Sequence, residues 1–176
     1  YEAEKIFAKR NNAVILRFAT AFGFSYRMRL DLLVNQFVYE AITNKALTVY
    51  GQNYFRSIAH VSDIARSIRF AIHHREKMQG QKFNVGTPEL IYTKAQIAEH
   101  IKQQVDFSLH FAEATPDAEG KEYHMSTHKI NTAGFCTNVT LDQGIRELVF
   151  AIRSIKFERN CFNNLTPPIC LAAINS

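Results

Sequence analysis

Apolar positions recur at the spacing of an amphipathic helix in several stretches of the chain. In residues 30–44 they are Leu30, Leu33, Val34, Phe37, Val38 and Ala41. In residues 61–72 they are Val61, Ile64, Ala65, Ile68, Ala71 and Ile72. Each set follows the i, i+3, i+4, i+7 pattern, so both segments are predicted to be helices with one buried face.

Two more helices are indicated by the residues that would begin them. Thr93 is followed three residues later by Gln96, and Thr140 by Gln143. A threonine followed at this distance by glutamine is a capping box, which marks the start of a helix. The expected inward faces are Ile97, Ile101 and Val105 in the first helix, and Leu141, Ile145, Leu148, Val149, Ile152 and Ile155 in the second. Residues 1–10, rich in strong helix formers, are expected to be helical too.

Short apolar runs between these helices predict β-strands. Residues 13–18 form an unbroken run that suits a strand covered on both faces, as in a parallel sheet. Further strands are expected at 47–50, 54–59 and 82–86, and an alternating one at 107–111. Strands that alternate with helices indicate an α/β fold. Residues 158–176 lack periodicity and are expected to be an irregular tail.

Composition narrows the classes of protein without choosing one. The 176 residues suffice for one domain with a core, and the net charge of +5 is scattered rather than clustered. We interpret it first as a solvated surface, second as attraction for a phosphate-bearing ligand and only third as nucleic-acid binding. Three cysteines outside any CxxC pair favour a reducing, cytoplasmic location and no metal site. No apolar run reaches membrane-spanning length, so no membrane partner is expected.

The first five residues carry a pair that can do chemistry. Tyr1 and Lys5 are four residues apart and would share one face of a helix. An ammonium group beside a phenol stabilises the phenolate and lowers the pKa of the phenol, which can then exchange a proton with a substrate hydroxyl. Taken alone, the pair fits an ordinary surface helix better. The motifs that follow it change that interpretation.

Those motifs form an ordered series. They are AVILRFATAFG at 13–23, LTVYG at 47–51, RSIAHVSDIA at 56–65, FNVG at 83–86, AGF at 133–135 and LDQGI at 141–145. Together with Tyr1 and Lys5, the series resembles extended short-chain dehydrogenases/reductases of the UDP-glucose 4-epimerase group, from Tyr1 to about Lys156. The resemblance implies an α/β fold in which residues 1–157 interleave the C-terminal part of a Rossmann-type NAD(P)-binding fold with the small substrate-binding α/β subdomain.

The resemblance also implies roles for individual residues. Tyr1 matches the catalytic acid/base, Lys5 matches the catalytic lysine that also holds the nicotinamide ribose of NAD, and Phe18 lies near the cofactor. On the substrate side, Thr20 stands where the family often has asparagine. The other residues that match the binding of a nucleotide-diphosphate sugar are Asn35, Arg56 and Lys121 for the diphosphate and Val49 and Tyr50 for the base.

The function implied is that of an NAD-dependent nucleotide-sugar epimerase or dehydratase that works through a keto-sugar. No Gly-rich phosphate-binding turn is found in the sequence. We therefore expect a fragment that is inactive alone, with NAD bound mainly by a preceding half and with a homodimer in the full-length form. The alternative is a non-catalytic nucleotide-sugar-binding module. Nucleic-acid binding, which rests only on net charge, is the third hypothesis.

Several polar residues outside these motifs have simpler interpretations. His60 and Asp63 lie where a strand meets a helix, and we expect a structural histidine and a cap or hydrogen-bond anchor. His73 and His74 are expected at an exposed helix end. Cys136 has no base near it in the sequence, so a role as a thiol nucleophile is not expected.

Overall fold

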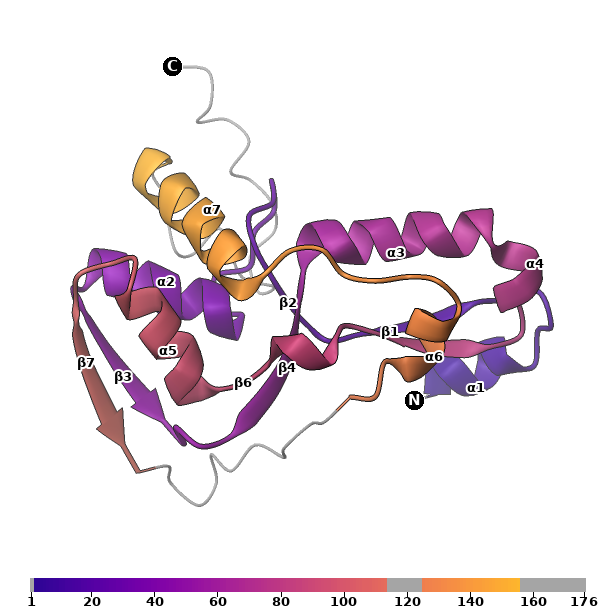
Figure 1. Ribbon diagram of the computed structural model, residues 1–176, viewed down its shortest axis with the longest axis horizontal. Helices are drawn as coiled ribbons and strands as arrows, with labels where there is room; N and C mark the ends of the chain where they lie inside the picture. The colour runs from indigo at the N-terminus through magenta and orange to yellow at the C-terminus, as the bar shows by residue number, and fades with distance from the viewer. Residues whose placement is uncertain (1, 114–124, 156–176) are drawn as a thin grey trace.

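The structure is a computed structural model that describes residues 2–113 and 125–155 of the chain. Figure 1 shows an elongated molecule in which two groups of helices and strands flank a small central sheet. The central sheet has the order β2-β4-β6 and consists of β2 (Thr20–Phe22), β4 (Phe55–His60) and β6 (Ile91–Thr93). Strand β4 pairs in parallel with β2 and antiparallel with β6. A short 3-10 helix, η1 (Pro88–Leu90), leads into β6.

One flank is built on the parallel pair of β1 (Ile15–Phe18) and β5 (Lys82–Val85). Its helices are α1 (Glu2–Ala8), α3 (Val61–His73), α4 (Arg75–Met78) and α6 (His128–Thr132). Figure 1 shows α3 along one side of the strand pair and α1 on the other. The buried residues of this flank form a small cluster: Ala71, Met78, Phe83, Val85, Ile130 and Phe135.

The other flank is built on the parallel pair of β3 (Ala46–Tyr50) and β7 (Ser108–Ala112). Two helices pack on it, α2 (Leu33–Thr43) and α5 (Lys94–Lys102), and a third, α7 (Leu141–Ser154), packs on these two helices. This flank holds the larger core cluster, which extends through Phe22 and Ile58 into the central sheet. The apolar faces predicted for 30–44 and for the two capped helices supply much of it, so these helix predictions are confirmed.

Both predicted capping boxes are present. The hydroxyl of Thr93 accepts from the amide of Gln96, and the side chain of Gln96 accepts in return from the amide of Thr93. Thr140 and Gln143 make the same pair of bonds at the start of α7. At the other end of α7, however, Ile155 follows the last helical residue and its side chain is exposed. Its expected inward position was wrong because the helical periodicity ends one residue earlier.

The buried face of α3 also differs from the prediction. The residues that the helix buries are Asp63, Ser67 and Ala71, which lie four apart. Ile68 and Ile72, expected inside, are exposed, Ile72 by 68% of its surface. The physical reason is the carboxylate of Asp63, which the loop before α7 holds through hydrogen bonds and which therefore sets the rotation of the helix.

Gly144 of α7 lies against two side chains at the junction of the central sheet and α3. A Cβ atom at this position would lie 2.3 Å from Phe22 Cε2 and 3.0 Å from His60 Cδ2. Phe22 is fully buried, so its ring has little room to move. We expect Gly144→Ala to lower the free energy of unfolding by about 1–3 kcal/mol, the usual cost of overpacking a core.

Urea unfolding followed by circular dichroism measures this effect. Gly86→Ala is the matched control, because a Cβ there would meet its nearest neighbour at 3.4 Å, an ordinary contact distance. Equal midpoints for the two variants would contradict the close packing of α7 on Phe22.

Candidate functional site

The sequence predicts several substrate-binding residues, and those that the structure describes lie on or beside the central sheet. Thr20 begins β2, where its Cα partner on β4 is Ile58. Arg56 lies two residues before Ile58 on β4. Residues two apart in a strand share a face, and partner residues of neighbouring strands project to the same side. The pairing of β2 with β4 therefore places Thr20 and Arg56, distant in sequence, on one face of the sheet.

Asn35 supports the loop that follows β2. Its side chain is 98% buried, since only 2% of its surface is exposed. The oxygen Oδ1 accepts from the amide of Gly23 at 3.0 Å, and Nδ2 donates to the carbonyl of Arg29 at 3.0 Å. In this structure Asn35 thus holds both ends of the loop.

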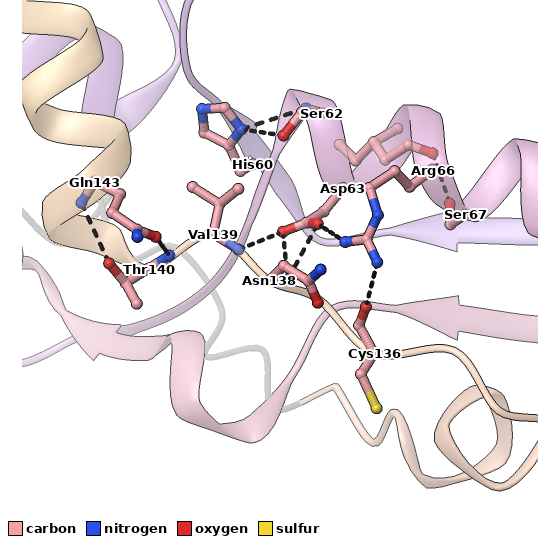
Figure 2. Close-up of polar contacts among 11 residues, drawn as sticks. His60, Ser62, Asp63, Arg66, Ser67, Cys136, Asn138, Val139, Thr140 and Gln143 are labelled. Carbon is pink, nitrogen blue, oxygen red and sulfur yellow. Dashed lines mark hydrogen bonds and ion pairs between the residues drawn. The ribbon is translucent and has the colours of Figure 1, made fainter.

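Gly23, at the start of this loop, contacts His60. Its φ of +113° is unfavourable for residues with a side chain, and a Cβ would lie 2.3 Å from His60 Nε2. His60 is buried and its Nδ1 accepts from the amide of Ser62, so that the imidazole caps α3 (Figure 2). His60 Nε2 lies 3.0 Å from Glu147 Oε2, an ion-pair distance without hydrogen-bond alignment. His60 is a structural histidine, as predicted.

Asp63 is the hydrogen-bond anchor that the sequence indicated. Its side chain is completely buried. Figure 2 shows its carboxylate between α3 and the loop before α7. The amide of Asn138 lies 3.1 Å from both carboxylate oxygens, the amide of Val139 donates at 3.0 Å, and Arg66 of the same helix forms an ion pair with it. Asp63 thereby joins the two flanks of the molecule.

The end of β3 and the connection to β4 form the second part of the candidate site. The side chain of Tyr50 is exposed, whereas that of Val49 is buried in the core with 1% exposed. Only the main chain of Val49 is therefore placed to contact a ligand. Arg56 is half-buried and its guanidinium donates to the carbonyl of Phe55 at 2.8 Å.

Lys94 lies beside these residues, although sequence reasoning gave it no functional role. Its Nζ donates to the carbonyl of Tyr50 at 2.9 Å and lies 5.9 Å from the centre of the Tyr54 ring. In the sequence it stands only as the second residue of a capping box. Its proximity to Tyr50 depends on the pairing of β4 with β6, which no local pattern indicates.

Two of the residues predicted to bind the cofactor, Lys5 and Phe18, lie on the flank that carries α1. Lys5 is exposed and its ammonium forms an ion pair with Glu2 at 2.9 Å, and Phe18 is exposed at the end of β1. The Arg17 guanidinium beside Glu4 lowers the pKa of that carboxyl to about 2, so Glu4 is an anion held to β1. Tyr1 and Lys121 lie outside the described residues, as does the tail 158–176.

The described residues offer neither a cluster of metal ligands nor a helix suited to a membrane. In residues 2–113 and 125–155, no group of three His, Cys, Asp or Glu side chains is placed to hold a metal ion. None of the helices in this part of the chain has the length and apolarity that a membrane span requires.

Comparison with known proteins gives a clear result for the fold. No family model matches the chain. Among solved structures, Pal from Bacillus thuringiensis is 22% identical, with a TM-score of 0.74 over 88% of this chain and 51% of that one. UDP-glucuronic acid 4-epimerase from Bacillus cereus, in complex with UDP-glucuronic acid and NAD, is 21% identical, with a TM-score of 0.69 over 81% and 46%. dTDP-glucose 4,6-dehydratase from Bacillus anthracis, in complex with NAD, is 20% identical, with a TM-score of 0.68 over 84% and 48%.

These likenesses establish the α/β fold class predicted from the sequence. The structure is mixed α/β with parallel strand pairs, and it superposes on Rossmann-type, NAD-dependent epimerases and dehydratases along most of its length. The chain spans about half the length of the solved structures that it matches.

Proposed function

We propose that this chain is the substrate-binding part of an NAD-dependent enzyme that epimerises or dehydrates a nucleotide-diphosphate sugar. The observation that carries the proposal is the pairing of β2 with β4, which places Thr20 and Arg56 on one face of the central sheet. A guanidinium binds phosphate oxygens through two parallel hydrogen bonds, and a hydroxyl can bond to a sugar or a phosphate. The likeness in fold to epimerases and dehydratases supports the same function.

In this proposal the residues of the chain bind, orient and move a proton. Arg56 and Lys121 hold the diphosphate, with Asn35 bonding to it from α2. Tyr50 and the main chain of Val49 lie along the base, and Thr20 bonds to the sugar or a phosphate. The phenolate of Tyr1 takes a proton from a sugar hydroxyl, and Lys5 stabilises that phenolate. NAD, when bound, accepts and returns the hydride.

The exposed surfaces around β1 are evidence for the proposal that a cofactor-binding half continues the sheet at this strand. Within the described residues β1 pairs only with β5, and a sheet of two strands has little stability alone. Exposed apolar side chains lie on both helices that flank this pair: Ile6 and Phe7 on α1, and Ile68 and Ile72 on α3. Exposed apolar surface of this kind marks sites of contact with other protein. Lys5 and Phe18 lie on the same flank and suit the nicotinamide end of NAD. The proposal includes a cytoplasmic homodimer for the full-length enzyme.

Replacing Arg56 tests the substrate site. Arg56→Ala is expected to weaken UDP binding by about 2–5 kcal/mol, the cost of removing one partner of a buried, charge-assisted pair. Isothermal titration calorimetry of UDP into the wild type and the variant measures it.

Arg69→Ala, which removes an exposed arginine of α3, is the matched control and should bind UDP as the wild type does. An unchanged dissociation constant in Arg56→Ala would remove Arg56 from the phosphate site. A wild-type chain that bound no nucleoside diphosphate would contradict the proposed function as a whole.

A further inference from the structure

We propose that Lys94 is a further cation of the substrate site and that it holds the diphosphate together with the residues named above, Arg56 among them. This inference rests on the proposed function and extends it, because it assigns a ligand-binding role to a residue outside every motif of the resemblance. It also predicts a selectivity: the site should favour ligands with two phosphates over ligands with one.

The first support is the position of Lys94 at the start of α5. The amide of Lys94 donates to the carbonyl of Tyr54 at 3.2 Å, and the amide of Ala95 donates to the carbonyl of Gln52 at 3.0 Å. The beginning of α5 is thereby attached to the connection between β3 and β4. The same connection carries Tyr50, whose carbonyl accepts from Lys94 Nζ. The ammonium group is therefore held beside the segment proposed to lie along the base.

The second support is the register between β4 and β6. Phe55 is the Cα partner of Thr93, and Arg56 is the partner of Tyr92. Lys94 follows directly after Thr93, so the register places its backbone beside that of Tyr54, two residues before Arg56. The two cations come from different elements, a helix and a strand, and lie near the same end of the central sheet, where the charge of Arg56 acts on Lys94.

The third support is electrostatic. Burial lowers the pKa of Lys94, and the positive charge of Arg56 lowers it further. Both effects disfavour the ammonium form, and an anion bound beside the two cations would oppose them by stabilising both positive charges. A diphosphate suits such a pair, because the guanidinium grips two oxygens in its fixed plane while the ammonium binds as a point charge at a different angle.

A purely structural lysine would have the same bond to Tyr50 and the same contact with Tyr54. The two roles differ in what happens when the charge alone is removed. Lys94→Gln keeps a hydrogen-bond donor near the Tyr50 carbonyl but loses the charge, and Lys94→Arg keeps the charge. If Lys94 binds phosphate, UDP affinity should fall in Lys94→Gln, which loses the charge, and be largely kept in Lys94→Arg, which retains it. If Lys94 only attaches α5 to the connection, UDP affinity should be the same in both variants, and thermal stability should depend on whether the hydrogen-bond donor to Tyr50 is kept.

The test is calorimetric titration of UDP and of UMP into the wild type, Lys94→Gln and Lys94→Arg. We expect Lys94→Gln to weaken UDP binding at least tenfold and UMP binding far less. Lys94→Arg should retain most of the UDP affinity. Lys102→Gln, a charge removal at the exposed opposite end of α5, is the matched control and should bind both ligands as the wild type does.

The outcomes separate this inference from the proposed function. If Arg56→Ala weakens UDP binding but Lys94→Gln does not, Lys94 is structural and the inference is overturned while the proposed function stands. A wild-type chain that binds neither UDP nor UMP overturns both. If Lys94→Gln fails to fold, the comparison of UDP with UMP in the wild type and in Lys94→Arg decides. Equal affinities for the two ligands in both proteins would show that the second phosphate makes no contact with Lys94, and would overturn the inference.

Discussion

Replacing Tyr1 with phenylalanine, in a form of the protein that carries the cofactor-binding half, is expected to lower turnover by about 10²–10⁴-fold, the range attributed to general acid–base catalysis. The substitution removes only the phenolic oxygen and keeps the ring. Nucleotide-sugar affinity should therefore change little, because the proposed binding contacts come from Arg56 and Lys94 on the central sheet and the start of α5. A loss of turnover without loss of binding is the signature of an interaction made only in the transition state.

The measurement is steady-state turnover of a nucleotide sugar together with calorimetric affinity for UDP. Tyr26→Phe provides the matched control, since the side chain of Tyr26 is exposed and lies in the loop before α2. Normal turnover of Tyr1→Phe would show that another group moves the proton. A wild-type protein that binds NAD and UDP but turns over no nucleotide sugar would favour the alternative of a non-catalytic binding module.

Asp63→Ala should produce the largest loss of stability among single substitutions in α3. The buried carboxylate accepts from the amides of Asn138 and Val139 and from Arg66. Each hydrogen bond to a charged group contributes about 1.5–3 kcal/mol, and water can reach part of the exposed Arg66 side chain once the carboxylate is gone. We expect the free energy of unfolding to fall by about 2–4 kcal/mol. Because Asp63 joins the two flanks, the unfolding transition should also become less cooperative.

Urea unfolding monitored by far-ultraviolet circular dichroism measures both effects. Asp31→Asn is the control: Asp31 also pairs with an arginine, Arg29, but both side chains are well exposed. Exposed ion pairs contribute about 0–1 kcal/mol, so this variant should unfold close to the wild-type midpoint. Similar midpoints for Asp63→Ala and Asp31→Asn would show that the Asp63 hydrogen bonds do not hold the flanks together.

Several elements could be predicted because their causes are local. The apolar stripe of α2 and the capping boxes of α5 and α7 lie within single segments, and each gave a helix within a few residues of the predicted bounds. The segments of β1 and β5 likewise gave strands, and these pair in parallel. The residues of β1 are half-buried or exposed, however, so the cover expected on both faces of this strand is not found within the described residues. By contrast, β2 and β6 have three residues each, too few to show a period of two, and were not predicted as separate strands.

The residues of the candidate site also fall into two groups, those that sequence patterns indicate and those that only the structure brings to notice. Roles for Arg56, Asn35 and Tyr50 were implied by the resemblance of the ordered motifs to a known family, and they stay predictions. The burial of the Val49 side chain and the position of Lys94 could not be inferred from the sequence, because each depends on strands brought together from distant parts of the chain. The role of Asn35 in holding the loop from Gly23 to Arg29 also needed the structure, since both of its partners are backbone groups.

The sequence by itself determined the α/β class and the helices with a clear period or cap, and it left Asp63 as either a cap or a hydrogen-bond anchor. Only the tertiary structure decided which face of α3 is buried, how β4 pairs with β2 and β6, and which lysine lies beside Tyr50. The physical reason is that a helix forms through backbone hydrogen bonds between residues four apart, so a short segment of sequence is enough to show its pattern. Strand order, helix rotation and the meeting of charges depend on contacts between distant segments, and in α3 one buried carboxylate outweighed the apolar pattern of the helix.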